Sequence, residues 1–341
     1  MPANTIDKKA VDTHVNGVIG GDRRLLAKTV TLVESSHPKH RDLAGLVLDR
    51  LLPYTGNAIR LGITGVPGVG KSTFIEALGL LLVGKGHRLA VLAVDPSSSR
   101  SGGSILADKT RMVSLCNAEN AFIRPSPSGG TLGGVARMTR EAMLICEAAG
   151  FDVIFIETVG VGQSETSVHA MVDFFLVLML AGAGDELQGL KKGVLELADA
   201  LVINKADGDN IVRAKKAQME YENALHLINP YSANWQPSVK TCSSLTRSGL
   251  LDIWEMVSKH RRIMMDNGEF FENRKRQNRQ WMWSLLEDGL KESFLKNQRV
   301  KNRLPGVMQK VDAGSITPFA AARELLALIN HDPTASESDA L

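Results

Sequence analysis

The sequence predicts an α/β fold in which a mostly parallel central sheet has helices on both faces, with helical extensions at both ends. Short apolar runs of about four to eight residues recur along the middle of the chain, as buried parallel strands require. Glycine-rich or polar loops follow most of these runs, and stretches with helical apolar spacing lie between them. Residues 1–56 and 269–341 show helical spacing only.

The expected elements follow in chain order. We expect strands at residues 59–63, 88–94, 121–124, 151–156, 173–180, 200–203 and 239–242. We expect helices at residues 23–34, 42–52, 74–82, 132–149, 249–265 and 318–329. Residues 1–15 are polar and are predicted to fray, and Pro305-Gly306 is predicted to break the chain between two helices. These patterns divide the chain into a helical N-terminal extension, a nucleotide domain and a helical C-terminal extension, at residues 1–56, 57–268 and 269–341.

Composition excludes several classes of protein. The net charge of +3 over 341 residues is too small to indicate binding to nucleic acid or to a membrane surface. Three cysteines without C-x-x-C spacing favour a reducing compartment over a disulfide framework. The first residues contain no apolar signal-peptide core, and the longest apolar run, residues 174–181, is far shorter than the roughly 20 residues of a membrane-spanning helix. We therefore expect a cytoplasmic protein with no membrane contact.

The most informative motif lies at residues 65–72, GVPGVGKS, which match the P-loop pattern G-x-x-x-x-G-K-[ST] between a predicted strand and a predicted helix. Such a loop turns its backbone N–H groups onto phosphate oxygens at the positive end of a helix. Lys71 is expected to reach the β- and γ-phosphates and Ser72 to bind Mg²⁺. A plain glycine turn is the alternative, and the complete motif in this setting disfavours it. The predicted phosphate-binding residues are Gly65, Val66, Pro67, Gly68, Val69, Gly70, Lys71, Ser72 and Thr73.

Acidic residues follow two other predicted strands. Glu157 ends the strand at residues 151–156, where P-loop proteins place an acid that holds Mg²⁺, and Gly160 can offer its N–H to the γ-phosphate. Asp95 ends the strand at residues 88–94, and either binds the metal or caps the next segment. Asp108 is a further candidate ligand at the start of a predicted helix. The candidate catalytic residues are thus Lys71, Asp95 and Glu157, and the candidate metal ligands are Ser72, Asp95, Asp108 and Glu157.

A base-reading motif follows the strand at residues 200–203. Asn204-Lys205-Ala206-Asp207 has the form N-K-x-D, in which the Asp carboxylate accepts hydrogen bonds from the N1–H and 2-amino groups of guanine. Adenine lacks both donors, so the motif favours GTP and GDP over ATP. Ser243, Ser244 and Leu245 follow the last strand, where a backbone N–H is expected to contact the guanine carbonyl.

Three features allow two interpretations each. The loops at residues 97–104, 157–163 and 181–193 are each interpreted as nucleotide-sensitive switches. For residues 181–193, an ordinary charged surface loop is the alternative. The helices before residue 56 either form a partner surface or pack on the nucleotide domain. The stripe of Met282, Leu286, Leu290 and Phe294 serves either self-association or intramolecular packing.

Together these residues resemble the MeaB/ArgK family of P-loop GTPases, whose human member is the methylmalonic aciduria type A protein. The resemblance covers nearly the whole chain and rests on the segments GVPGVGKST, AVDPSS, ETVGVGQSE, AGAGDELQG and NKAD. It implies a homodimer built through the C-terminal extension, slow GTP hydrolysis, and a chaperone role toward adenosylcobalamin-dependent methylmalonyl-CoA mutase. It also implies that Lys71, Asp95, Asp108 and Glu157 are phosphate- and metal-site residues, and that residues 181–193 form a switch coupled to the partner.

Two other functions compete with a regulatory GTPase. The first is a P-loop kinase linked to transport of basic amino acids, an older label of the same family, which would need a phosphoacceptor pocket and an arginine-rich lid. The second is a deviant P-loop ATPase of the chromosome-partitioning kind, which carries a second lysine early in the loop. Val66 occupies that position here and disfavours it. The sequence shows no evident arginine finger, so we expect slow hydrolysis that a partner accelerates.

Overall fold

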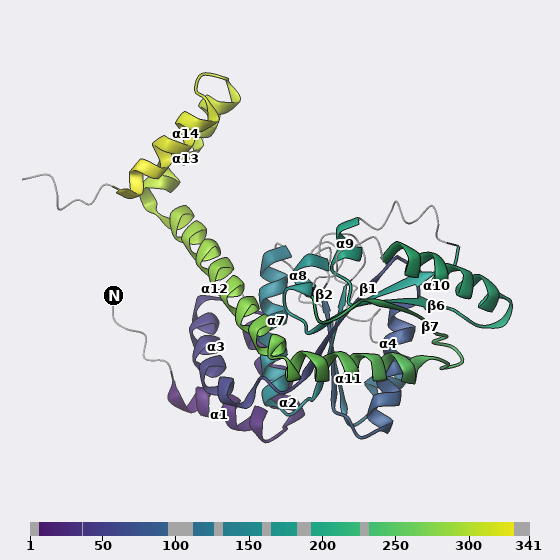
Figure 1. Ribbon diagram of the computed structural model, residues 1–341. Helices are drawn as coiled ribbons and strands as arrows, with labels where there is room; N and C mark the ends of the chain where they lie inside the picture. Colours follow the sequence, from purple (N-terminus) through teal and green to yellow (C-terminus); the bar gives the residue numbers. More distant parts are fainter. Residues whose placement is uncertain are drawn as a thin grey trace, which may run out of the picture. The chain divides into compact units, whose positions relative to one another are not determined.

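The fold is described from a computed structural model, in which residues 7–35, 37–94, 112–125, 132–158, 165–182, 192–225 and 232–330 are described. The chain forms two compact units, Met1–Arg274 and Lys275–Leu341. In the described part of the first unit, seven strands form one sheet in the order β3-β2-β4-β1-β5-β6-β7 (Figure 1), and every neighbouring pair is parallel. The predicted fold class is confirmed, whereas the three-part division of the chain stays a prediction.

Each predicted strand is present within two residues of its expected bounds. The strands are β1 (Ile59–Gly65), β2 (Leu89–Val94), β3 (Ala121–Arg124), β4 (Val153–Thr158), β5 (Phe174–Leu180), β6 (Ala200–Asn204) and β7 (Ser238–Thr241). The helices up to residue 266 are α1 (Lys8–Ile19), α2 (Arg23–Val33), α3 (Pro38–Leu51), α4 (Lys71–Gly84), α6 (Val113–Cys116), α7 (Leu132–Ala148), α8 (Glu165–His169), α9 (Lys192–Glu196), α10 (Ile211–Leu225) and α11 (Leu250–Asp266). Those that follow are α12 (Glu269–Lys296), α13 (Gln298–Asp312) and α14 (Pro318–Asn330).

The sheet separates two apolar cores because successive strand side chains point to opposite faces. On one face, alternate residues such as Ile154, Ile156 and Val177 join a core with side chains of α7, α8 and α10. On the other face, residues such as Phe155 and Leu176 join a core with side chains of α4, α6 and α11. Both faces of the sheet are therefore covered by helices. Ligands are expected at the carboxyl ends of the parallel strands.

The N-terminal helices pack on this domain. α2 and α3 contact α7, and their buried side chains belong to the same core as those of α7. Arg23 donates to the carbonyl oxygen of Ala121 over 2.9 Å, and Arg124 forms an ion pair with Glu34. Intramolecular packing, one of the two interpretations of these helices, is what the structure contains.

Two predictions about the chain ends are wrong. Residues 8–15 do not fray but form most of α1, in which Asp7 accepts a hydrogen bond from the N–H of Lys9 over 2.9 Å. Val11, Val15 and Val18 share the buried side of this helix, and their spacing is the helical signal that the polar composition hides. Pro305 does not end a helix either, because α13 runs through it.

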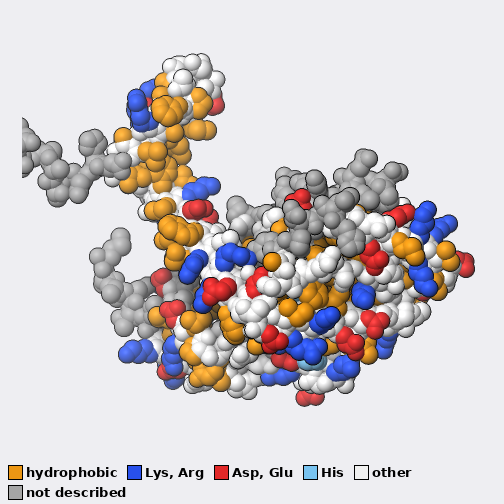
Figure 2. Space-filling model, in the orientation of Figure 1, with side chains coloured by type: hydrophobic (Ala, Val, Ile, Leu, Met, Phe, Trp, Pro, Cys, Tyr) orange, Lys and Arg blue, Asp and Glu red, His pale blue; other side chains and the backbone are white. Residues whose placement is uncertain are grey.

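The second unit contains most of α12 together with α13 and α14. α13 packs against α14, and Arg303 bonds Glu324 over 2.6 Å between them. Val300 and Val307 are buried, which favours α13 although Pro305 removes one backbone hydrogen bond from it. Hydrophobic side chains gather on the visible surface of this unit (Figure 2), and Met282, Trp283, Leu286 and Leu290 are 47–70% exposed. No described helix, α12 included, has the length and apolar character needed to cross a bilayer.

A buried ion pair holds the first turns of α12. It joins Arg274 of this helix to Asp173, the residue before β5. The guanidinium of Arg274 donates to both carboxylate oxygens of Asp173 over 2.8 and 2.7 Å, and also to the carbonyl oxygens of Gly56 and Ala58. Asp173 further accepts from the N–H of Arg60 over 2.9 Å. Burial raises the pKa of the Asp173 carboxyl, but the Arg274 and Arg60 charges outweigh burial and bring that pKa below its ordinary value.

We predict that Arg274→Ala lowers the free energy of unfolding by about 3 kcal/mol or more, because it leaves the Asp173 carboxylate buried without its cation. Chemical denaturation followed by circular dichroism measures the change. Arg279→Ala is the matched control on an exposed side of α12 and should stay within about 0.5 kcal/mol of wild type. A loss no larger than that of the control would show that the ion pair contributes little.

Candidate functional site

The P-loop joins the end of β1 to the start of α4, and its backbone needs glycine at two positions. Gly65 has a φ of 154°, and a Cβ there would lie 2.4 Å from the carbonyl oxygen of Leu178. Gly70 has a φ of 90° and directly precedes Lys71, the first residue of α4. These conformations favour glycine, and they bring the N–H groups of the first helical turn to the loop.

The side chain of Lys71 lies along the loop. Its Nζ donates to the carbonyl oxygen of Gly65 over 2.8 Å and to that of Val66 over 3.3 Å. Burial lowers the pKa of the Lys71 ammonium, while the negative charges of Glu157 and Glu165 act in the opposite direction. Glu165 begins α8 and is only 4% exposed. No motif singled it out, so sequence reasoning missed this second carboxylate near the lysine predicted to bind phosphate.

Two predicted metal ligands meet at the carboxyl end of β4. The hydroxyl of Ser72 donates to Oε1 of Glu157 over 3.3 Å, although 85 residues separate them. A hydroxyl and a carboxylate are hard oxygen donors of the kind that Mg²⁺ takes, so the pair fits that ion. Asp95, Asp108 and Gly160 lie outside the described residues. Among the residues that are described, no group of three or more His, Cys, Asp or Glu side chains forms a metal site.

Asn204 joins the P-loop to both loops that are predicted to read the base. Its Nδ2 donates to the carbonyl oxygen of Val69 over 2.9 Å, and its Oδ1 accepts from the N–H and the hydroxyl of Ser244 over 3.2 and 2.9 Å. The side chain is 1% exposed, so these bonds form away from water. The residue predicted as part of a base reader thus also sets the distance between the phosphate loop and the base-reading loops.

The other residues predicted to read the base lie beside Asn204. Lys205 has a φ of 59° and its Nζ donates to the carbonyl oxygen of Gly68 over 2.9 Å, which places its stem across the P-loop. The hydroxyl of Ser243 donates to Oδ2 of Asp207. That bond orients the carboxylate and brings the Ser243 loop to the N-K-x-D loop. Leu245 is 82% exposed. The structure therefore brings together the P-loop, Glu157, Asn204, Lys205, Asp207 and the loop at residues 243–245.

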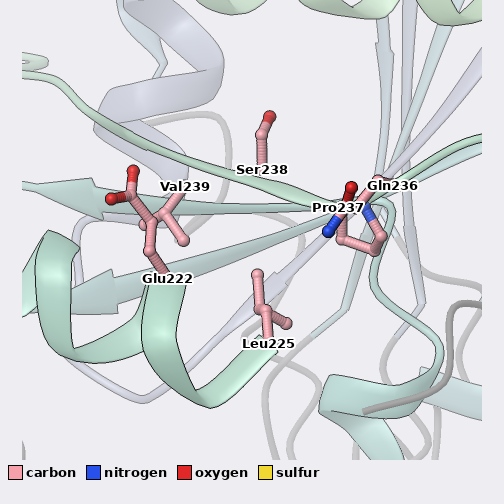
Figure 3. Close-up of a pocket in the computed structure, with 6 residues that line it drawn as sticks. All are labelled: Glu222, Leu225, Gln236, Pro237, Ser238 and Val239. Carbon is pink, nitrogen blue, oxygen red and sulfur yellow. The ribbon is translucent and has the colours of Figure 1, made fainter. Parts of the chain in front are cut away.

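A pocket of about 250 Å³ lies elsewhere in the domain. Figure 3 shows its lining residues, which come from the end of α10, from the two residues before β7 and from the start of β7. Ser238 is the first residue of β7, so the pocket lies at the end of the strand opposite Ser243 and Ser244. The pocket is therefore separate from the loops that hold the predicted nucleotide site. Its lining residues are Glu222, Leu225, Gln236, Pro237, Ser238 and Val239.

Comparison with known families identifies this arrangement. The family described as "Methylmalonyl Co-A mutase-associated GTPase MeaB" matches residues 26–299. The chain belongs to the MeaB family of P-loop GTPases. The resemblance and the GTPase class predicted from the motifs are confirmed.

Relatives in this family extend over almost the whole chain. A probable GTPase of Mycobacterium tuberculosis (strain H37Rv) is 52% identical, over 97% of this chain and 98% of its own length. The mouse protein named methylmalonic aciduria type A homolog, mitochondrial, is 44% identical over 94% of this chain and 80% of its own length. A solved structure titled "Crystal structure of LAO/AO transport system kinase" is 39% identical, with a TM-score of 0.75, and covers 96% of this chain and 99% of that one.

We predict that Asp207→Asn shifts base preference from guanosine to xanthosine nucleotides in this MeaB-family chain. The amide would accept from N1–H and donate to the 2-carbonyl of xanthine, whereas guanine would lose a charge-assisted hydrogen bond. GDP affinity should fall about tenfold or more and XDP affinity should rise, as measured by competition with a fluorescent nucleotide. Asp209→Asn, on an exposed side chain of the same segment, is the control. Unchanged guanine preference would refute the assignment of Asp207.

Proposed function

We propose that this chain is a nucleotide-switched chaperone of adenosylcobalamin-dependent methylmalonyl-CoA mutase that gates cofactor loading and protects the mutase from inactivation. The observation that carries the proposal is the family match over residues 26–299, since that family is described as mutase-associated. The name of the mouse relative supports the same partner. Similarity over 98% of the length of the mycobacterial relative and 80% of the length of the mouse relative is what makes a shared partner reasonable.

The proposed hydrolytic site uses the contacts of the P-loop and its neighbours. Lys71 would neutralise the β- and γ-phosphates of GTP, and Ser72 and Glu157 would hold Mg²⁺ together with Asp95 and Asp108. When bound, Mg²⁺ supplies charge neutralisation at the phosphates. Glu157 would hold the ion directly or through water, while the N–H of Gly160 would sense the γ-phosphate. Asn204 holds the P-loop and the base-reading loops in one arrangement, so that base and phosphates are bound together.

Regulation by a partner is proposed because hydrolysis by this class is fast only with an arginine at the phosphates. Arg60 and Arg274, two buried arginines of the first unit, bond acidic residues and carbonyl oxygens at the ends of the strands opposite the P-loop, so neither serves as that arginine. We propose that turnover of the chain alone is slow, and that the mutase accelerates it through the loop at residues 181–193. Most of that loop lies outside the described residues. The three scattered cysteines, without C-x-x-C spacing, support a cytoplasmic location.

The test uses the immobilised full chain and the purified methylmalonyl-CoA mutase of the same organism. With a non-hydrolysable GTP analogue and with GDP, the mutase should be retained with affinities that differ by about fivefold or more, because only a difference between nucleotide states lets hydrolysis switch the complex. Lys71→Ala, which lacks the proposed phosphate contact, should remove this difference. Equal or absent retention in both nucleotide states would refute the proposal.

A kinase remains the second candidate, because the solved structure of the 39% identical relative is titled a transport system kinase. A kinase transfers the γ-phosphate to an acceptor other than water. Incubation of the full chain with γ-labelled GTP, with and without cell extract, separates the two functions. Label in inorganic phosphate alone supports a GTPase, and label in a protein or a small molecule supports a kinase.

We also propose that the second unit forms a homodimer. Its exposed apolar side chains, among them Trp283 at 61% and Leu290 at 70% exposure, are more than a solvated helix needs. Burying them against a second copy would remove this surface from water.

We predict that Leu290→Glu converts the dimer to a monomer, as measured by light scattering coupled to size exclusion. Lys291→Glu, at the next position of α12, introduces the same carboxylate on an exposed neighbouring side chain and should leave the dimer intact. A wild-type chain that runs as a monomer at micromolar concentration would exclude the dimer.

A further inference from the structure

A pair of buried threonine hydroxyls lies directly behind the nucleotide-binding loops. The hydroxyl of Thr158, the last residue of β4, donates to the hydroxyl of Thr64 on β1 over 2.7 Å. Thr64 is 1% exposed and Thr158 is fully buried. Neither residue belongs to the P-loop or the N-K-x-D motif. Within the described part of the chain, the side-chain hydrogen bond of each threonine is to the other threonine.

The pair occupies polar positions in an otherwise apolar row across the sheet. Thr158 is in register with Val94 of β2, and Thr64 is in register with Val177 of β5. Both valines are fully buried and belong to the core on the α7 and α8 face. Valine has nearly the shape of threonine, so packing alone does not require hydroxyls here. A buried hydroxyl is unfavourable unless it is bonded, and the two threonines satisfy this need through each other.

The hydroxyl bond lies where the strand ladder stops. The paired residues of β1 and β4 end at Ile63 and Glu157, one residue before Thr64 and Thr158. The side-chain bond therefore connects the two strands at the point where they lead into the P-loop on one side and into residue 159 on the other. A hydrogen bond is directional, so it fixes the distance between these strand ends more closely than apolar contact does.

Each threonine is adjacent in sequence to a residue of the proposed phosphate and metal site. Thr64 precedes Gly65, whose carbonyl oxygen accepts from Lys71. Thr158 follows Glu157, whose carboxylate accepts from Ser72 on the opposite face of the sheet. The Ser72–Glu157 separation of 3.3 Å is at the long end for a hydrogen bond, so a small shift of the end of β4 changes it.

We propose that the Thr64–Thr158 pair is a positioning contact of the GTPase site, which holds Glu157 and Ser72 at the spacing that binds Mg²⁺. The inference rests on the proposed metal role of Ser72 and Glu157. The pair acts through the strand ends: it ties β4 to β1 on one face of the sheet, and the carboxylate on the other face is thereby held against α4. The hydroxyls bond each other, so the role assigned to the pair is positioning and not direct binding of the metal.

The experiment compares Thr158→Val, Thr64→Val and the double variant with Thr139→Val. Thr139 is a matched control, since it is 3% exposed on α7 and its hydroxyl bonds the carbonyl oxygen of Val135 over 3.0 Å. Binding of a fluorescent GTP analogue is titrated with Mg²⁺, and the melting temperature is measured without nucleotide or metal. These two readouts separate a positioning role from a loss of stability.

Each single site variant should raise the half-saturating Mg²⁺ concentration by about threefold to tenfold, the range expected for one neutral hydrogen bond. Thr139→Val should change it less than twofold, whatever its melting temperature. The double variant should resemble the single variants, because all three lack the same contact. Thr158→Ser keeps the hydroxyl and should give the wild-type Mg²⁺ requirement. It therefore separates loss of the hydrogen bond from poor folding caused by a change at this buried position.

A half-saturating Mg²⁺ concentration that Thr158→Val and Thr64→Val leave unchanged would overturn the inference and reduce the pair to a packing feature. Glu157→Gln distinguishes this outcome from failure of the proposed site. If Glu157→Gln raises the Mg²⁺ requirement and the threonine variants do not, the positioning role alone is wrong. If Glu157→Gln has no effect, the metal assignment is wrong, and the positioning inference is overturned with it.

Discussion

The buried amide of Asn204 is the contact on which the candidate site depends. It donates to Val69 in the P-loop and accepts from Ser244, so that one side chain joins the P-loop to the loop predicted to read the base. The side chain is away from water, where an unmade hydrogen bond is costly, and this favours a single spacing between the loops. A guanine nucleotide that spans both loops would be bound best when the spacing between the loops is kept constant.

Because side chains alternate along β4, the last two residues of this strand make contacts on opposite faces of the sheet. Glu157 points to the α4 face and meets Ser72, while the next residue, Thr158, points to the α7 and α8 face and bonds Thr64. A single strand end therefore carries a site residue on one side and a structural bond on the other. At the opposite end of the sheet, Arg274 holds the starts of β1 and β5 through Asp173 and Ala58.

Much of this architecture was predictable, and the errors have physical causes. The strands were found because buried parallel strands are continuous apolar runs, which few other elements produce. α1 was missed because its polar residues outnumber the three valines that it buries. α13 runs through Pro305 although a backbone bond is lost there, and it packs against α14 with Val300 and Val307 buried. Propensity describes a segment by itself, whereas these two helices are decided by what lies against them.

The sequence by itself determined the chemistry of the loops: a glycine-rich phosphate loop, an acid after a buried strand, and an N-K-x-D segment each carry a local pattern. The sequence also predicted that Ser72 and Glu157 share a metal ion, but only the tertiary structure decided which side chains bond one another. Ser72 reaches Glu157 across 85 residues, and Asn204 reaches Val69 across 135. Those meetings follow from the strand order around β1, which places the carboxyl ends of distant strands at one edge. Spacing along a chain has no information about that order, because it arises from how helices pack on both faces of the sheet.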